Sequence, residues 1–177
     1  MASSVPPVTA PSRRGEGSEV TSPGYRGGMR PPHATTVADV SESALLALIL
    51  DELGRASAAV VGPGDDAAVL SVADGSVVVS TDTLVHGPDF RLAWSTGFDL
   101  GAKSAAVNLA DIAAMGARPT ALLVALALPP QTEVDFVRQL ARGLRSACES
   151  LAPGCAVEGG DLTASDTLTI AVTALGV

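Results

Sequence analysis

Acidic and hydroxyl side chains recur at four places in this chain, each beside glycines or an apolar run. The four segments are residues 62–66 (Gly-Pro-Gly-Asp-Asp), 80–83 (Ser-Thr-Asp-Thr), 104–111 and 158–161 (Glu-Gly-Gly-Asp). Carboxylate, hydroxyl and carbonyl oxygens are the hard ligands that Mg²⁺ and Ca²⁺ prefer. Adjacent carboxylates such as Asp65 and Asp66 repel each other unless a positive charge lies beside them. We therefore predict that these segments converge on one acidic site that binds metal ions and the phosphates of a nucleotide.

The third segment is expected to lie on a helix. Ser104, Asn108 and Asp111 are spaced i, i+4 and i+7, so a helix would present them on one face. Most neighbouring positions are small or apolar, and a buried Asp111 would then need a metal ion or a basic partner. Taken singly, each of the four segments also fits an ordinary role: a solvated turn, a capped strand end, the solvent face of a helix and a tight turn. No Ser/His/Asp or Cys/His combination indicates nucleophilic catalysis.

Composition narrows the classes of function. The 177 residues are 47% hydrophobic and only 3% aromatic, and the formal net charge is −8 at pH 7. An acidic chain with so few aromatic rings is a poor match for nucleic acid or an anionic membrane, and it suits a protein that gathers cations. The N-terminus lacks a signal-peptide pattern and no apolar run is long enough to span a bilayer, so we expect a cytoplasmic protein. Cys148 and Cys155 are expected to be reduced thiols with a structural role.

Two regions differ in composition. Residues 1–36 are rich in Pro, Ser, Gly and Arg and have almost no large apolar side chains, which predicts a disordered tail. Residues 37–177 are predicted to form one folded domain. Its expected elements are, in order, a helix at 41–53, strands at 67–72 and 76–81, a helix at 98–115, a strand at 121–128, a helix at 132–151 capped by Thr132, and strands at 155–158 and 168–175.

The two strands at 67–72 and 76–81 are predicted to form a hairpin across the Ala-Asp-Gly turn between them. The second strand would deliver Thr81 and Asp82 to its C-terminal end, and residues 84–97 would follow as a loop. Because strands and helices are mixed and at least one hairpin is expected, the pattern favours the α+β class over a doubly wound sheet.

The order of the four segments resembles the N-terminal domain of thiamine-monophosphate kinases over roughly residues 41–177. The runs that carry the resemblance are Gly62-Pro63-Gly64-Asp65-Asp66-Ala67-Ala68, Ser80-Thr81-Asp82-Thr83-Leu84-Val85, Ala106-Val107-Asn108-Leu109-Ala110-Asp111-Ile112-Ala113-Ala114-Met115-Gly116-Ala117 and Gly159-Gly160-Asp161. The Gly-Asp-Asp and Gly-Gly-Asp pieces are shared with a wider superfamily that includes aminoimidazole ribonucleotide synthetases, selenophosphate synthetases and hydrogenase maturation factors.

The resemblance implies ATP-dependent phosphorylation of thiamine monophosphate to thiamine diphosphate. It also implies a mixed sheet with helices packed on one face, and a homodimer formed through that sheet. The residues implied to bind Mg²⁺ are Asp66, Ser80, Thr81, Asp82, Asp111 and Asp161. Gly160 and Asp161 would also lie against the ATP phosphates, and the loop at 86–91 would contact the thiamine substrate through Asp89. No residue is predicted to act as a covalent or acid–base catalyst, because the acceptor is already a phosphate.

The chain departs from the family pattern in two places. Gly87-Pro88-Asp89-Phe90 stands where the family carries Gly-x-His-Phe, and His86 stands where an acidic residue is common. The family's C-terminal domain has no counterpart in these 177 residues.

Two alternatives stay open from the sequence. One is a superfamily relative that uses ATP to activate another substrate. A selenophosphate synthetase, however, would carry a reactive Cys before the Gly-Asp-Asp segment, and no Cys precedes Cys148. The other alternative is a shortened module that dimerises without catalysing a reaction.

Overall fold

The order of helices and strands follows the predicted α+β pattern closely. The computed structural model describes residues 34–54, 59–63, 68–72 and 75–177. Within these residues a short 3-10 turn (Val37–Asp39) precedes three α-helices and four β-strands. The disordered tail predicted for residues 1–36 lies almost wholly outside the described residues and stays a prediction, as does the boundary of the folded domain.

One mixed sheet carries the strands in the order β1-β4-β2-β3. The strands are β1 (Val78–Val85), β2 (Pro119–Leu128), β3 (Ala156–Ala164) and β4 (Thr169–Gly176). The strand β4 runs antiparallel to both of its neighbours, whereas β2 and β3 are parallel and are joined through a helical crossover. As a result β1 and β3 are the two edge strands, and the residues predicted to share one site come from opposite edges of the sheet.

The three helices begin and end at the signals that the sequence carries. The helix α1 (Glu42–Leu53) starts at Ser41, whose Oγ accepts a hydrogen bond from Ala44 N, and it stops at Gly54, which has a φ of 71°. The helix α2 (Gly97–Ala114) starts with a capping box between Thr96 and Asp99. The helix α3 (Val134–Leu151) starts at Glu133, without a side-chain cap, and not at the predicted Thr132.

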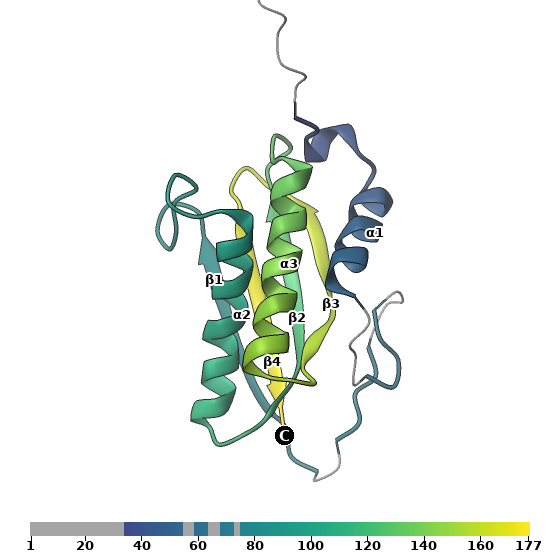
Figure 1. Ribbon diagram of the computed structural model, residues 1–177, viewed down its shortest axis with the longest axis vertical. Helices are drawn as coiled ribbons and strands as arrows, with labels where there is room; N and C mark the ends of the chain where they lie inside the picture. The colour runs from purple at the N-terminus through teal and green to yellow at the C-terminus, as the bar shows by residue number, and fades with distance from the viewer. Residues whose placement is uncertain (1–33, 55–58, 64–67, 73–74) are drawn as a thin grey trace, which may run out of the picture. The chain divides into compact units, whose positions relative to one another are not determined.

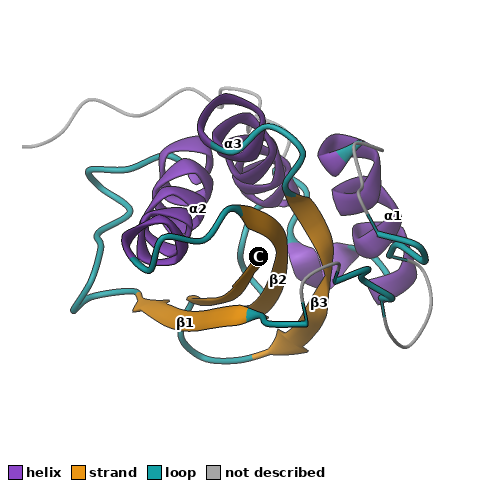
Figure 2. Cartoon of the chain, turned by 90° about the horizontal axis from the view of Figure 1, so that it is seen from below, coloured by secondary structure: helices purple, strands orange, loops and turns teal. Residues whose placement is uncertain are grey.

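The helices α2 and α3 lie side by side across one face of the curved sheet, and α1 lies beyond the β3 edge (Figures 1 and 2). Glycine lets α2 and α3 approach closely: a Cβ built on Gly101 would lie 2.0 Å from the backbone oxygen of Leu140. The buried core fills the space between these helices and the sheet, and the opposite face of the sheet has no helix over it within the described residues. Both cysteines are free and buried in this core, as predicted.

Three local expectations were wrong. The predicted hairpin at 67–81 does not form among the described residues: Val69 makes only an isolated bridge with Val61, and β1 pairs instead with β4. Because β1 extends to Val85, Thr81 and Asp82 lie in the middle of a strand and not at its end. The Gly-Gly-Asp segment also lies inside a strand, β3, which was expected to end at Glu158.

Candidate metal and nucleotide site

A polar cluster joins the middle of β1 to the C-terminal half of α2. Ser80 Oγ donates a hydrogen bond of 3.1 Å to Asp111 Oδ2. Asp82 lies two residues beyond Ser80, so its side chain is on the same, helix-covered face of β1. Its Oδ1 accepts a hydrogen bond from Thr83 N at 2.8 Å. The structure therefore joins two of the predicted metal ligands, Ser80 and Asp111, and places a third, Asp82, on the same face of β1.

Asn108 adds a buried amide to the same stripe of α2. Its side chain is 2% exposed, and Nδ2 donates to the backbone oxygen of Ser104 at 2.9 Å. Its Oδ1 is buried and accepts no hydrogen bond from the described residues. A buried acceptor left in this state costs about 1–3 kcal/mol. The donor set of two carboxylates, a hydroxyl and an amide oxygen is one that fits Mg²⁺.

Two other predicted ligands, Thr81 and Asp161, lie on the open face of the sheet. Thr81 pairs with Thr173 in β4, and the two hydroxyls are hydrogen bonded to each other; Thr81 Oγ1 also donates to Val172 O. Asp161 lies next to Ala125 in the β2–β3 register and is exposed. Thr173 was not singled out from the sequence, because only the pairing of β1 with β4 places it beside Thr81.

The sheet separates these residues into two groups. Asp82 and Asp161 lie on the two edge strands, β1 and β3, and on opposite faces of the sheet. Three inter-strand spacings separate these strands, which is about 14 Å measured along the sheet. Among the described residues no group of three or more His, Cys, Asp and Glu side chains could hold one metal ion. Asp65 and Asp66 lie outside the described residues. A single site containing every predicted ligand is thus not assembled by the described part of the chain.

The paired glycines of β3 differ in how much room they have. A Cβ on Gly160 would lie 1.8 Å from Val124 O, whereas one on Gly159 would make an ordinary 3.4 Å contact with Leu123 Cδ2. Gly160 therefore has a structural reason to be glycine, since a side chain would push β3 away from β2. Beside this segment runs a groove of about 990 Å³ lined by Gly159, Gly160 and Asp161 together with apolar residues of α1 and α3. Its lining continues along β2 and β4 through Leu123, Ala125, Ala171, Thr173 and Leu175.

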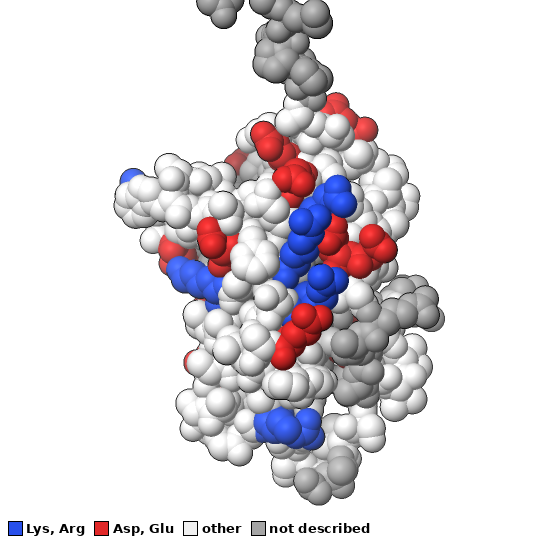
Figure 3. Space-filling model, in the orientation of Figure 1, with Lys and Arg blue, Asp and Glu red and all other residues white. Residues whose placement is uncertain are grey.

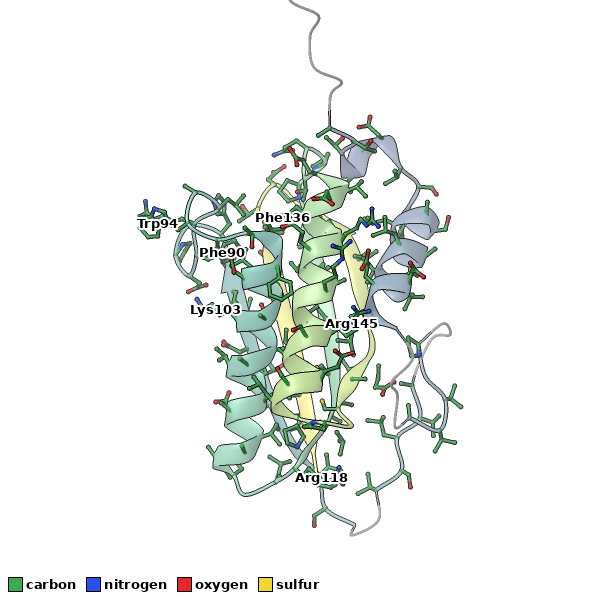
Figure 4. The ribbon with its side chains drawn as sticks, in the orientation of Figure 1. Phe90, Trp94, Lys103, Arg118, Phe136 and Arg145 are labelled. Carbon is green, nitrogen blue, oxygen red and sulfur yellow. The ribbon has the colours of Figure 1, made fainter. Side chains whose placement is uncertain are left out.

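The loop that follows β1 holds the predicted substrate contact, Asp89. Its Oδ2 accepts a 2.7 Å hydrogen bond from Val85 N, and its backbone oxygen accepts one from Lys103 Nζ at 3.2 Å. Figure 4 shows Lys103 pointing from α2 toward this loop, with Trp94 at the outer end of the loop. Trp94 is 78% exposed and stacks with Arg91. The carboxylate of Asp89 thus closes the loop on itself, a role that the sequence did not indicate.

Comparison with known proteins assigns the family. Residues 64–177 match the model described as "AIR synthase related protein, N-terminal domain". The chain belongs to the AIR synthase related protein family. The resemblance recognised in the sequence and the α+β fold are both confirmed.

The most informative relatives are thiamine-monophosphate kinases. The chain is 45% identical to the one from Corynebacterium glutamicum over 143 residues, which are 80% of this chain and 41% of that protein. The crystal structure of the enzyme from Stenotrophomonas maltophilia is 35% identical, with a TM-score of 0.62, over 81% of this chain and 43% of that one. A structure of AaThiL complexed with AMPPCP and TMP is 28% identical, with a TM-score of 0.55, over 76% of this chain and 41% of that one. The chain therefore spans about two fifths of the length of these relatives.

Among the described residues no helix is long and apolar enough to cross a bilayer.

Proposed function

We propose that this chain is the metal- and nucleotide-binding part of an enzyme that transfers a phosphoryl group from ATP to thiamine monophosphate. The observation that carries the proposal is the similarity to thiamine-monophosphate kinases over four fifths of the chain. In the reaction an oxygen of the acceptor phosphate bonds to the γ-phosphorus of ATP while the bond from that phosphorus to the β-bridging oxygen breaks. The products are thiamine diphosphate and ADP. The acceptor oxygen is already ionised, so the chain needs no general base.

The proposed contribution of β1 and α2 is to hold Mg²⁺ through Ser80, Asp82 and Asp111. Bound Mg²⁺ supplies charge neutralisation between the two phosphates that must meet. The short link from Ser80 to Asp111 fixes the carboxylate before any ligand arrives, so less ordering is needed on binding. Asp66, Thr81 and Asp161 stay proposed ligands of further ions.

The groove beside β3 is the proposed place for the nucleotide. Gly160 and Asp161 line it, and Gly159 gives it an open wall without a side chain. A solved relative bound to AMPPCP, an analogue of ATP, supports a nucleotide in this part of the family. Asp89 is proposed to act on the thiamine substrate through the shape of the loop that it closes, since its Oδ2 already accepts the Val85 N–H.

The uncovered face of the sheet supports the proposed homodimer. Val79 is 58% exposed on this face, at the β1 edge. Toward β3 the face continues with Leu123, Ala125 and Ala171, which also line the groove proposed for the nucleotide, so the dimer contact is proposed on the β1 side of that groove. An apolar sheet face of this kind is stabilised when a second sheet packs on it. A cytoplasmic location is part of the same proposal.

The test is calorimetric titration of the chain with AMPPCP, with and without Mg²⁺. We expect binding that requires Mg²⁺ and is lost in Asp82→Asn and in Asp111→Asn, while both variants keep the wild-type circular dichroism spectrum. Asp51→Asn is the matched control, because Asp51 is an exposed carboxylate on α1, away from the cluster. Nucleotide binding that both site variants retain would refute the assignment of the metal site. No binding by the wild type would favour the non-catalytic module.

A further inference from the structure

Asn108 has a buried side-chain oxygen to which none of the described residues donates a hydrogen bond. The backbone oxygen of Ser104 can only accept a hydrogen bond, so the group of Asn108 that contacts it must be the donor, Nδ2. The side-chain amide of Asn108 therefore directs its Oδ1 away from Ser104 O. That Oδ1 is buried, and it accepts no hydrogen bond from the described residues. Native proteins rarely leave a buried acceptor in this state without a water or an ion beside it.

The neighbours of Asn108 on α2 show which way the side chain faces. Asp111 contacts Ser80 in β1, and Ile112 packs against β4, where its Cγ2 would lie 2.3 Å from a Cβ built on Gly176. At about 100° per residue, Asn108 lies between Asp111 and Ile112 around the helix. Its side chain is therefore directed at the seam between β1 and β4, on the face of the sheet that carries Asp82.

Asn108 and Asp82 also lie at the same height along the sheet. The helix α2 runs antiparallel to β1, because Asp111 contacts Ser80 near the start of the strand while Lys103 contacts the loop that follows its end. From the Ser80–Asp111 contact, Asp82 is about 6.6 Å further along the strand and Asn108 is about 4.5 Å further along the helix. The two residues thus differ by only about 2 Å in height along the sheet, and both lie between β1 and α2.

We propose that Asn108 Oδ1 is an oxygen ligand of the divalent cation that Asp82 and Asp111 bind, with Ser80 beside them. This inference rests on the metal site of the proposed function and assigns it one further residue. A neutral amide oxygen adds a hard ligand without the repulsion that a third carboxylate would bring. The bond from Nδ2 to Ser104 O holds the amide in the orientation that presents its oxygen.

A purely structural role of Asn108 and a role as a metal ligand predict different effects of its substitution on cation binding. If Asn108 only filled space, leucine, which has a similar shape, would stabilise the fold at least as well. The substitution would remove Oδ1, a buried acceptor that has no hydrogen-bond partner in the described residues. Asn108→Leu should then be neutral or stabilising and should leave cation binding unchanged. If Oδ1 is a ligand, the same variant keeps its stability without metal and loses affinity for the cation.

The experiment is a titration of the full 177-residue chain with Mn²⁺ alone, followed by electron paramagnetic resonance, with urea unfolding in EDTA as the second readout. We expect Asn108→Leu to weaken Mn²⁺ binding at least about 10–100-fold, the loss typical of removing even a residue that only orients a metal ligand. Its unfolding midpoint in EDTA should be equal to that of the wild type or higher. Ser104→Ala is the matched control, because it removes a buried hydroxyl of α2 that, within the described residues, donates to Leu100 O. The backbone oxygen of Ser104 that holds the Asn108 amide is kept, so this variant should leave Mn²⁺ binding unchanged.

Asn108→Asp keeps an oxygen at this position and guards against a leucine variant that fails to fold. We expect it to be less stable than the wild type in EDTA and to be rescued by Mn²⁺, because a third carboxylate needs the cation. Unchanged Mn²⁺ affinity in Asn108→Leu, or a folded Asn108→Asp that binds no Mn²⁺, would overturn this inference and leave the metal site standing. A wild type that binds no Mn²⁺ would overturn both this inference and the metal site on which it rests.

Discussion

Besides the buried Leu45 and Ile49, one carboxylate of α1 attaches this helix to α3, and its removal gives a quantitative test of the fold. Glu52 on α1 accepts hydrogen bonds from Arg142 at 2.8 and 3.1 Å and from Arg138 at 3.1 Å. Figure 3 shows basic side chains along the α3 surface with acidic side chains on either side. We predict that Glu52→Gln destabilises the protein and loosens the α1 wall of the groove beside β3.

The size of the effect follows from the charge environment. The hydrogen bond from Arg142 is the largest cause of the pKa shift of Glu52, and burial, which comes next, opposes it. The hydrogen bond from Arg138 and the positive charges of both arginines add to the lowering, and the net result is a pKa of about 2 where the ordinary value is 4.5. At 1.36 kcal/mol for each pKa unit this corresponds to about 3 kcal/mol. The Glu52 side chain is only 12% exposed, but those of Arg138 and Arg142 are 43% and 44% exposed. Solvent screening therefore reduces the expected loss to about 1–2 kcal/mol.

The pH dependence has a definite sign. The folded state holds Glu52 ionised to a lower pH than the unfolded state does, so its stabilisation is complete above the unfolded pKa of 4.5. As the pH falls the unfolded chain takes up the proton first, and the stabilisation disappears as the pH passes through about 2. At about pH 3 less than half of it should remain.

Urea unfolding of the wild type and Glu52→Gln, followed by circular dichroism at pH 7 and about pH 3, measures both effects. Glu149→Gln is the control, since the Arg145–Glu149 pair is 3.7 Å apart and both side chains are well exposed; it should change the free energy of unfolding by less than about 0.5 kcal/mol. A loss in Glu52→Gln that is the same at both pH values would refute the electrostatic explanation. No loss at pH 7 would refute the role of Glu52 in holding α1.

Two glycine substitutions test the close approaches in the fold. Gly101→Ala should lower the free energy of unfolding by about 1–3 kcal/mol, because the new Cβ would meet Leu140 O. This loss should exceed the gain from the better helix propensity of alanine. A thermal or urea unfolding midpoint at or above the wild-type value would contradict this prediction. Gly160→Ala should also unfold more easily, since its Cβ would meet Val124 O, whereas Gly159→Ala should stay near the wild type. A fully stable Gly160→Ala that has lost only AMPPCP binding would instead assign Gly160 a ligand contact alone.

The helices could be predicted from the sequence because their signals are local. Ser41 and Gly54 bound α1 as expected, and the predicted helix at 98–115 differs from α2 by one residue at each end. Strand pairing is not local, and here prediction failed. The hydrogen-bonding partner of β1 is β4, about ninety residues later in the chain, and nothing between 67 and 81 distinguishes a hairpin from two separate extended segments.

The candidate site was predicted in its residue types but not in its geometry. The helical spacing of Asn108 and Asp111 correctly placed them on one stripe, and Ser80 does meet Asp111. Which face of the sheet each β1 residue occupies depends on the register with β4, and that register puts Ser80 and Asp82 under α2 but Thr81 on the open side. The side chains of Ser80 and Asp82 can therefore face one ion beneath α2, whereas that of Thr81 cannot.

The separation of the β1–α2 cluster from Gly160 and Asp161 limits how the proposed reaction could be organised. The cluster of β1 and α2 lies at one edge of the sheet, whereas Gly160 and Asp161 lie at the other, in a groove whose lining extends across the sheet to Ala171, Thr173 and Leu175 of β4. Phosphoryl transfer depends on positioning two anionic groups in line, with cations between them. If both regions serve one reaction, they must contact different parts of the bound phosphates, each with its own oxygen ligands. The sheet, whose edges hold the two regions a fixed distance apart, would then set the geometry of the transfer more directly than any single side chain does.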